Sequence, residues 1–334
     1  MDNKVLFKAI AIPLGASLLL GLSAKIEIVP VETKPSQEVS TPAEPATPKE
    51  KFNLVDVFFP LLPHQREQEQ EMEQKLEQEV LQTPQTQVPE TKPQTRYTRQ
   101  ELEALDNTPI TYGPGTATGG NPAPYAPDAQ KTYGKYGAHF IESGKNIIHL
   151  TFDCGYENFV DGQPLTGKIL DTLKEKNIKA LFFITQSYAE KNPELVRRIL
   201  DEGHTLGNHA AGNDSMPALS IDEMEQQIMG LHEYVKEHFG YTMKFFRPPN
   251  GDFSLRSLAV TQNLGYETVH WSFAYADWDI SNQPDPKEAL DKILSCHHDG
   301  AIYLLHGVSA TNAQILEDVI EGLWELGYHL YPLQ

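Results

Sequence analysis

The chain has 334 residues, with 27 Lys and Arg against 46 Asp and Glu, so its formal charge at pH 7 is −19. This balance argues against a nucleic-acid partner, because phosphate binding needs clustered Lys and Arg side chains. It also argues against an anionic membrane surface as the main ligand. The length allows two domains, or one large domain with appendages.

Residues 1–24 have the pattern of a targeting segment. Lys4 and Lys8 precede an apolar run from Ala9 to Ala24, which has about the length of the hydrophobic region of a secretory signal peptide. The run is short for a membrane span, and an uncleaved membrane anchor is the alternative. Both interpretations predict a protein outside the cytoplasm, either secreted, associated with the cell wall or tethered to the membrane.

Residues 25–107 are predicted to be a low-complexity linker. Residues 31–50 and 83–95 are rich in Pro, Thr, Glu and Gln, and such a composition cannot bury enough apolar surface to offset the entropy of ordering the chain. Residues 65–82 between them are typical of a short helix, which we interpret as a solvated spacer. The short apolar segment 52–63 has no assigned role. A spacer of this kind fits an enzyme that reaches a polymer of the cell wall.

Residues 108–334 are predicted to be the folded domain. Its first part, residues 111–127, is rich in Gly and Pro and is expected to wrap the domain as a loop. Strands and helices then alternate, which predicts a parallel α/β architecture, either a barrel or a doubly wound sheet. Ser220 and Glu223 form a capping box at the start of one helix. The expected strands are 145–152, 179–185, 204–209, 243–249, 267–272, 300–306 and 328–333, and the expected helices are 164–177, 193–203, 221–239, 254–265, 286–296 and 312–327.

Polar side chains follow five of the predicted strands, at the point where each strand leaves the core. They are Asp153, His209, Arg247, Asp277 and His306. In a barrel of parallel strands these positions face one mouth. A single Asp or His there is commonly a turn or structural residue, but five at five strand ends predict a site. Two carboxylates, two imidazoles and a guanidinium can supply a general base, a general acid and the groups that orient them.

Five segments, in this order and spacing, resemble the signature motifs of the polysaccharide deacetylase family. This family is also called carbohydrate esterase family four, or the NodB homology domain. The segments are TFDCGYEN, GNHAAGNDSMPALS, FRPPNGDFS, ADWDISNQ and AIYLLHGVS. The resemblance covers residues 145–333 and is greatest to the subgroup of delta-lactam-biosynthetic de-N-acetylases. It implies a distorted parallel (β/α) barrel and hydrolysis of an N-acetyl group on a sugar polymer.

The resemblance also implies roles for the residues at matching positions. Asp153 matches the general base that activates water, and Arg247 matches the arginine that orients this base. His306 matches the general acid that protonates the leaving amine, and Asp277 matches the carboxylate that tunes this histidine. An amide needs both groups, because its carbonyl is attacked while its amine is protonated.

The predicted substrate is peptidoglycan or a related polysaccharide, and above all its N-acetylmuramic residues. Trp278 matches a residue of the substrate groove, and we expect Tyr156 and Pro249, from the first and third motifs, to contact the glycan. The alternatives are a deacetylase of N-acetylglucosamine or chitin-type oligomers, an acetyl-xylan esterase, and a catalytically dead glycan-binding module. The dead module is disfavoured because the predicted base and acid and their partners are all present.

The predicted metal site departs from the family pattern. The resemblance implies an Asp-His-His set of zinc ligands, whereas Cys154, His209 and Asn213 occupy those positions here. Thiolate and imidazole are good zinc ligands, but a neutral amide is a poor one. We therefore expect zinc to be bound weakly or to be absent, with the substrate carbonyl then polarised by backbone N–H groups or His209. The chain's two cysteines are too few for a disulfide framework.

Overall fold

A parallel sheet forms the centre of the fold. Within residues 96–333, which the computed structural model describes, nine strands join one sheet in the order β11-β12-β3-β6-β7-β8-β10-β2, and β13 also pairs with β3. Every strand pair of this sheet is parallel. The strands are β2 Ala138–His139, β3 Ile147–Cys154, β6 Leu181–Ile184, β7 Thr205–Asn208, β8 Phe245–Phe246, β10 Glu267–Val269, β11 Phe273–Ala274, β12 Ala301–His306 and β13 His329–Leu330.

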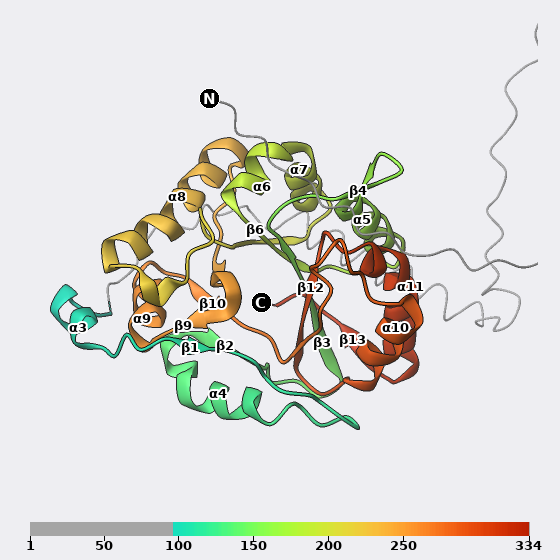
Figure 1. Cartoon of the computed structure of the whole chain (residues 1–334), viewed down its shortest axis with the longest axis horizontal. Helices are drawn as coiled ribbons and strands as arrows, with labels where there is room; N and C mark the ends of the chain where they lie inside the picture. The colour runs from blue at the N-terminus through green and yellow to red at the C-terminus, as the bar shows by residue number, and fades with distance from the viewer. Residues whose placement is uncertain (1–95, 334) are drawn as a thin grey trace, which may run out of the picture. The chain divides into compact units, whose positions relative to one another are not determined.

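Helices surround this sheet (Figure 1). The sheet curls into a barrel-like core, so the predicted distorted (β/α) barrel of the NodB type is confirmed. The helices are α3 Arg99–Ala104, α4 Tyr125–Tyr133, α5 Leu165–Glu175, α6 Gln186–Lys191, α7 Pro193–Asp201, α8 Ile221–Phe239, α9 Leu255–Asn263, α10 Pro286–Ser295 and α11 Ala310–Glu325, with short 3-10 turns at Gly134–Tyr136, Met216–Ala218 and Pro249–Gly251.

Two short antiparallel ladders accompany the main sheet. β1 (Ile110–Thr111) pairs with β9 (Asp252–Phe253), and β4 (Phe159–Val160) pairs with β5 (Gln163–Pro164). The second ladder is a hairpin between β3 and α5. It therefore leaves the sheet at the end of β3 that carries Asp153.

The strands of the sheet have two apolar faces. A small cluster that includes Leu181 and Phe183 of β6 and Ile302 of β12 lies on the inner face. A larger cluster, which includes Phe182 of β6 and Leu305 of β12, lies on the outer face among the helices. Because successive residues of a strand point to opposite faces, strands buried on both sides read as continuous apolar runs.

The predicted strands and helices of the alternating part all occur, in the predicted order. The best example is α8, whose bounds match the prediction. The Ser220 hydroxyl accepts a hydrogen bond from the backbone N–H of Glu223, and the backbone N–H of Ser220 donates one to the Glu223 carboxylate. Gly240 ends the helix with a φ of 68°. The elements that were not predicted are helices α3, α4 and α6 and strands β1, β2, β4, β5, β9 and β11. In particular, α4 begins inside the segment that we expected to be loop.

The predicted end of the linker, at residue 107, is corrected by the structure. Residues 96–107 contain α3, and they pack on α9 through a buried Leu102. Arg256 of α9 donates hydrogen bonds to the carbonyl oxygens of residues 102, 103 and 105. Asn263 bonds to the backbone of Tyr97. The folded unit therefore begins before the predicted boundary at Thr108.

The predicted leader, the helix at 65–82 and most of the linker lie outside the described residues. Residues 1–24 and 25–95 stay predictions for that reason. None of the helices in the described part of the chain combines the length and the hydropathy that a membrane span requires.

Candidate active site

Two strands at the centre of the sheet bring the predicted base and acid together. β3 and β12 are neighbours, and in their ladder His306 stands directly opposite Asp153. Because the strands are parallel and in register, both side chains point to the same face of the sheet. The carboxylate and the imidazole therefore meet at the carboxyl ends of the strands, as the sequence predicted.

Arg247 holds the Asp153 carboxylate in place. Its Nη1 lies 2.7 Å from Oδ1 of Asp153, and both side chains are buried. The remaining guanidinium nitrogens donate to the carbonyl oxygens of Val269 and His270, each at 3.0 Å, and the guanidinium carbon lies 4.2 Å from the centre of the Phe183 ring. Burial works to raise the pKa of Asp153, but the charge of Arg247, together with those of His209 and His306 and the Arg247 hydrogen bond, outweighs it and lowers the pKa below its usual value.

Asp277 holds His306 in a second buried pair. Oδ1 of Asp277 lies 2.7 Å from Nδ1 of His306, and Oδ2 accepts a hydrogen bond of 2.8 Å from the His306 backbone N–H. Burial works to lower the pKa of His306, but the hydrogen bond and charge of Asp277 raise it above its usual value. Because Nδ1 is held by Asp277, Nε2 is the nitrogen available for proton transfer.

His209 faces the base as a hydrogen-bond acceptor. Its Nδ1 lies 2.8 Å from the carbonyl oxygen of Arg247, which can only accept, so Nδ1 carries the proton. Burial lowers the pKa of His209, which keeps the ring neutral. The unprotonated Nε2 lies 3.6 Å from Oδ2 of Asp153. These two acceptors are suited to a group that donates to both, such as the attacking water.

Cys154 points to the other face of β3. Its thiol is fully buried in the outer apolar cluster. A Cβ added to Gly307 would lie 2.8 Å from Cys154 Sγ and 3.0 Å from Thr166 Oγ1, so the thiol packs against these two residues. Burial raises the pKa of Cys154 well above its usual value, whereas zinc binds the thiolate.

The three predicted zinc ligands do not come together. His209 faces Asp153, Cys154 faces the helices, and Asn213 is an exposed residue whose backbone carbonyl accepts a bond from Asn250. Within residues 96–333 no group of three or more His, Cys, Asp or Glu side chains is arranged to hold a metal ion. A structural or catalytic zinc site needs at least three protein ligands. The residues present therefore do not fit the zinc site that the resemblance implies.

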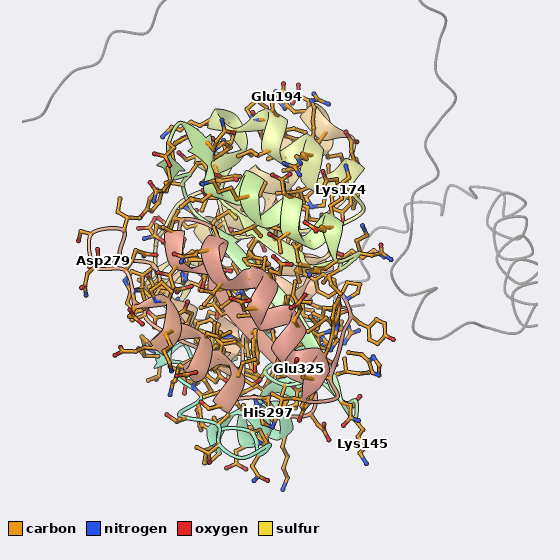
Figure 2. All side chains as sticks on the ribbon, turned by 90° about the vertical axis from the view of Figure 1, so that its right-hand side faces the viewer. Lys145, Lys174, Glu194, Asp279, His297 and Glu325 are labelled. Atoms are coloured by element: carbon orange, nitrogen blue, oxygen red, sulfur yellow. The ribbon has the colours of Figure 1, made fainter. Side chains whose placement is uncertain are left out.

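The predicted substrate contacts are divided between the surface and the interior. Tyr156 and Trp278 are half exposed, and the Trp278 ring centre lies 6.0 Å from that of His306. Asp279, the next residue, lies on a loop that projects from the domain (Figure 2). Pro249, in contrast, is buried in the turn after β8, which leaves it unsuited to direct contact with a glycan.

Two residues that support the site were missed in the sequence. Asn312 donates a 2.6 Å hydrogen bond to Oδ2 of Asp277 and one of 3.2 Å to the His306 carbonyl. Glu157 accepts hydrogen bonds from the backbone of Thr166 and from the hydroxyl of Tyr188, and so fixes the loop after β3. Glu157 lies within the first of the five motifs and Asn312 lies three residues after the last, but sequence proximity does not reveal which partner each one holds.

Comparison with known proteins places these features in a family. Residues 141–269 match the family described as polysaccharide deacetylase. The chain is 37% identical over 227 residues to an uncharacterized 30.6 kDa protein of Geobacillus stearothermophilus, covering 67% of this chain and 84% of that protein. It is 37% identical over 230 residues to the peptidoglycan-N-acetylmuramic acid deacetylase PdaA of Bacillus subtilis, covering 68% and 86%.

A solved structure agrees with these matches. The structure of Bacillus subtilis PdaA, described as a family 4 carbohydrate esterase, superposes with a TM-score of 0.64 at 35% identity. The match covers 68% of this chain and 96% of that one. The chain belongs to the polysaccharide deacetylase family, carbohydrate esterase family four.

Proposed function

We propose that this protein removes N-acetyl groups from N-acetylmuramic residues of peptidoglycan by hydrolysis. Membership of the family and 37% identity to PdaA support a hydrolase that deacetylates a cell-wall glycan. The observation that carries the assignment of roles is the β3–β12 ladder, which sets Asp153 and His306 opposite each other with a separate orienting partner for each.

Asp153 is proposed as the general base. Its lowered pKa keeps it ionised, and Arg247 leaves Oδ2 free on the side that faces His209. A water that donates to Oδ2 of Asp153 and to Nε2 of His209 is oriented for attack on the acetyl carbonyl carbon. Asp153 takes one proton from this water as the new C–O bond forms.

His306 is proposed as the general acid. Its raised pKa favours the imidazolium, and Nε2 can then pass its proton to the amide nitrogen as the C–N bond breaks. The products are acetate and a free amine on the sugar. His209 accepts at Nε2, so it does not supply the hydrogen bond to the carbonyl oxygen, and backbone N–H groups are left as the predicted donors.

The setting of the reaction is also part of the proposal. Peptidoglycan lies outside the cytoplasmic membrane, which agrees with the predicted leader at residues 1–24 and the linker that follows it. The catalytic domain is proposed to include residues 96–107 together with 108–334. A tether to the membrane through the N-terminus stays a prediction.

Acetate release from purified full-length protein tests the function. The substrates are peptide-free peptidoglycan strands, intact peptidoglycan and N-acetylglucosamine oligomers, each with and without a chelator. We expect acetate from the peptidoglycan strands, with new amines on muramic residues by mass spectrometry. Acetate mainly from N-acetylglucosamine oligomers would reassign the substrate, and glycan binding without acetate release would indicate a dead module.

A further inference from the structure

Two loops that follow strands next to the acid carry exposed apolar side chains. Eight large apolar side chains in residues 96–333 are more than a third exposed, and four of them lie in two loops. Tyr156 (50% exposed) and Phe159 (57%) follow β3, while Trp278 (55%) and Ile280 (50%) follow β11. Exposed apolar clusters on a folded domain commonly mark a binding surface.

The order of the strands sets these loops on either side of the acid. β12, which ends at His306, lies between β11 and β3 in the sheet. Neighbouring strands are about 4.8 Å apart, so the strands that lead into the two loops are separated by roughly 10 Å. This spacing suits a chain of about two sugar units running across His306, with one loop at each end.

The hairpin β4–β5 carries Phe159 on a rigid base. Its ladder pairs Phe159 with Pro164, and its turn residues Asp161 and Gly162 have φ values of 52° and 75°. Two positive φ values fit the tight type I′ turn that favours an Asp-Gly pair. Asn158, at the base of the hairpin, donates a hydrogen bond of 3.1 Å to the carbonyl oxygen of Val308. Val308 is two residues beyond His306, so the hairpin is joined to the loop that carries the acid.

We propose that Phe159 is a platform for a sugar ring of the glycan on the β3 side of the reacting residue. This inference rests on the proposed function. The face of a sugar ring presents C–H groups, which pack on the electron-rich face of an aromatic ring. Asp161 and Gln163 of the same hairpin are exposed polar residues that can hydrogen-bond to sugar hydroxyls. A rigid platform also loses little conformational entropy when the glycan binds.

A glycan fits this surface better than a lipid bilayer does. The polar sequence neighbours of Phe159 are Glu157, Asn158, Asp161 and Gln163, which are acidic or amide residues rather than Lys or Arg. The whole chain carries a formal charge of −19. An anionic membrane attracts basic residues. The platform therefore makes Phe159 a residue that selects for substrate length, and it predicts that longer glycans are better substrates than a single disaccharide.

The test compares peptide-free glycans of two, four and six sugars. The variants are Phe159→Ala, Phe159→Tyr and the control Tyr331→Ala. Tyr331 is equally exposed (52%), but it follows β13, which pairs with the first residues of β3 at the end away from Asp153. The readout is kcat and KM from acetate release, with thermal unfolding to verify each fold.

We expect wild-type protein to have a higher kcat/KM on the hexasaccharide than on the disaccharide. Phe159→Ala should lower this ratio by about threefold to tenfold, through KM, as the loss of one aromatic contact predicts. Phe159→Tyr and Tyr331→Ala should keep the ratio. An unchanged ratio in folded Phe159→Ala, or a wild-type protein indifferent to length, would overturn the platform while leaving the proposed function intact.

A binding measurement distinguishes an error in the Phe159 proposal from an error in the proposed deacetylase function. The affinity of the hexasaccharide is measured by calorimetry for wild-type protein and for Phe159→Ala. A protein that binds the hexasaccharide through Phe159 and releases no acetate from any length would overturn the proposed function and support the platform. Phe159-dependent binding to anionic vesicles in place of the glycan would overturn the platform.

Discussion

Asp153 and Cys154 are adjacent in the chain, yet they lie in two different regions of the molecule. Asp153 faces the inside of the barrel, where Arg247 keeps it ionised. Cys154 faces the helices, where burial keeps its thiol protonated. The end of β12 repeats the contrast: His306, its last residue, lies on the inner face, and Gly307, directly after the strand, packs against Cys154 on the outer face. In β3 and β12, the proposed catalytic residues lie on the inner face and the residues that pack against the helices lie on the outer face.

The contrast between Asp153 and Cys154 explains why the motif placed Cys154 wrongly in the active site. A motif is a linear string, and it carries Cys154 into the site because the residue before it belongs there. The pleat of a strand sends the next side chain to the opposite face. The segment IIHLTFDC is one continuous strand through Cys154, so the alternation could have predicted that the thiol leaves the site.

Removing the base should have the largest effect on activity. Asp153→Asn keeps the shape of the side chain but cannot accept the proton from water, so acetate release should fall by about 10²- to 10⁴-fold. The same change leaves Arg247 buried without its charge partner, which should destabilise the fold by roughly 3–5 kcal/mol. Acetate release and thermal unfolding measure the two effects.

His306→Gln is the matched variant for this test. It removes the acid but leaves the pair of Asp153 and Arg247 intact, so its activity should fall similarly. Asp277 loses the imidazole but keeps its hydrogen bonds from Asn312 and from the backbone N–H of residue 306, so the loss of stability should be smaller. Turnover near that of wild-type protein in either folded variant would refute the assigned roles on the inner face.

The fold was predictable where local signals are strong. α8 has a capping box at Ser220 and Gly240 at its end, and both signals lie within or beside the helix. α3 is different, because it is short and its anchors Arg256 and Asn263 are more than 150 residues away. No reading of residues 96–107 alone reveals those partners. The predicted linker therefore included residues 96–107, which belong to the folded unit.

The site was predictable as a set of residue types, and less so as a geometry. The five strand ends pointed to Asp153, Arg247 and His306, and the structure brings them together. The register that sets His306 opposite Asp153 depends on the pairing of strands about 150 residues apart. The role of Asn312 was hidden because it lies inside the first turn of α11, where its contact with Asp277 cannot be read from the sequence.

The pH dependence of the reaction should distinguish the base with its partner Arg247 from the acid with its partner Asp277. The reaction needs Asp153 ionised and His306 protonated, so kcat/KM should fall at acid pH below the lowered pKa of Asp153 and at alkaline pH above the raised pKa of His306. Asp277→Asn removes the charge that raises the pKa of His306. The alkaline limb should then move to lower pH.

The acid limb is the internal control, because the groups that lower the pKa of Asp153 are Arg247, His209 and His306 and not Asp277. The acid limb lies below the ordinary pKa of an Asp side chain, so a profile of kcat/KM against pH from roughly 2 to 10 measures both limbs. If the alkaline limb stays in place or moves to higher pH in Asp277→Asn, another group is the acid.

Substitutions on the outer face of β3 should change the free energy of unfolding more than the rate of acetate release. Gly307→Ala introduces a Cβ about 2.8 Å from Cys154 Sγ, and overpacking of this kind lowers the free energy of unfolding by about 1–3 kcal/mol. Adding Cys154→Ala removes the sulfur and should recover part of the loss. Chemical denaturation of the two single variants and the double variant measures the coupling. Additive effects would show that the two side chains do not meet.

Cys154→Ala alone should have the smallest effect on activity. The thiol is protonated, fully buried and on the outer face, so its loss should lower stability by about 1 kcal/mol and leave acetate release and zinc content near those of wild-type protein. His209→Ala is the inner-face control and should lower activity, because Nε2 of His209 faces the Asp153 carboxylate. Elemental analysis and acetate release with a chelator titration measure both variants. If Cys154→Ala loses zinc and activity together, the thiol reaches the inner face during the reaction and the division between the two faces of β3 is wrong.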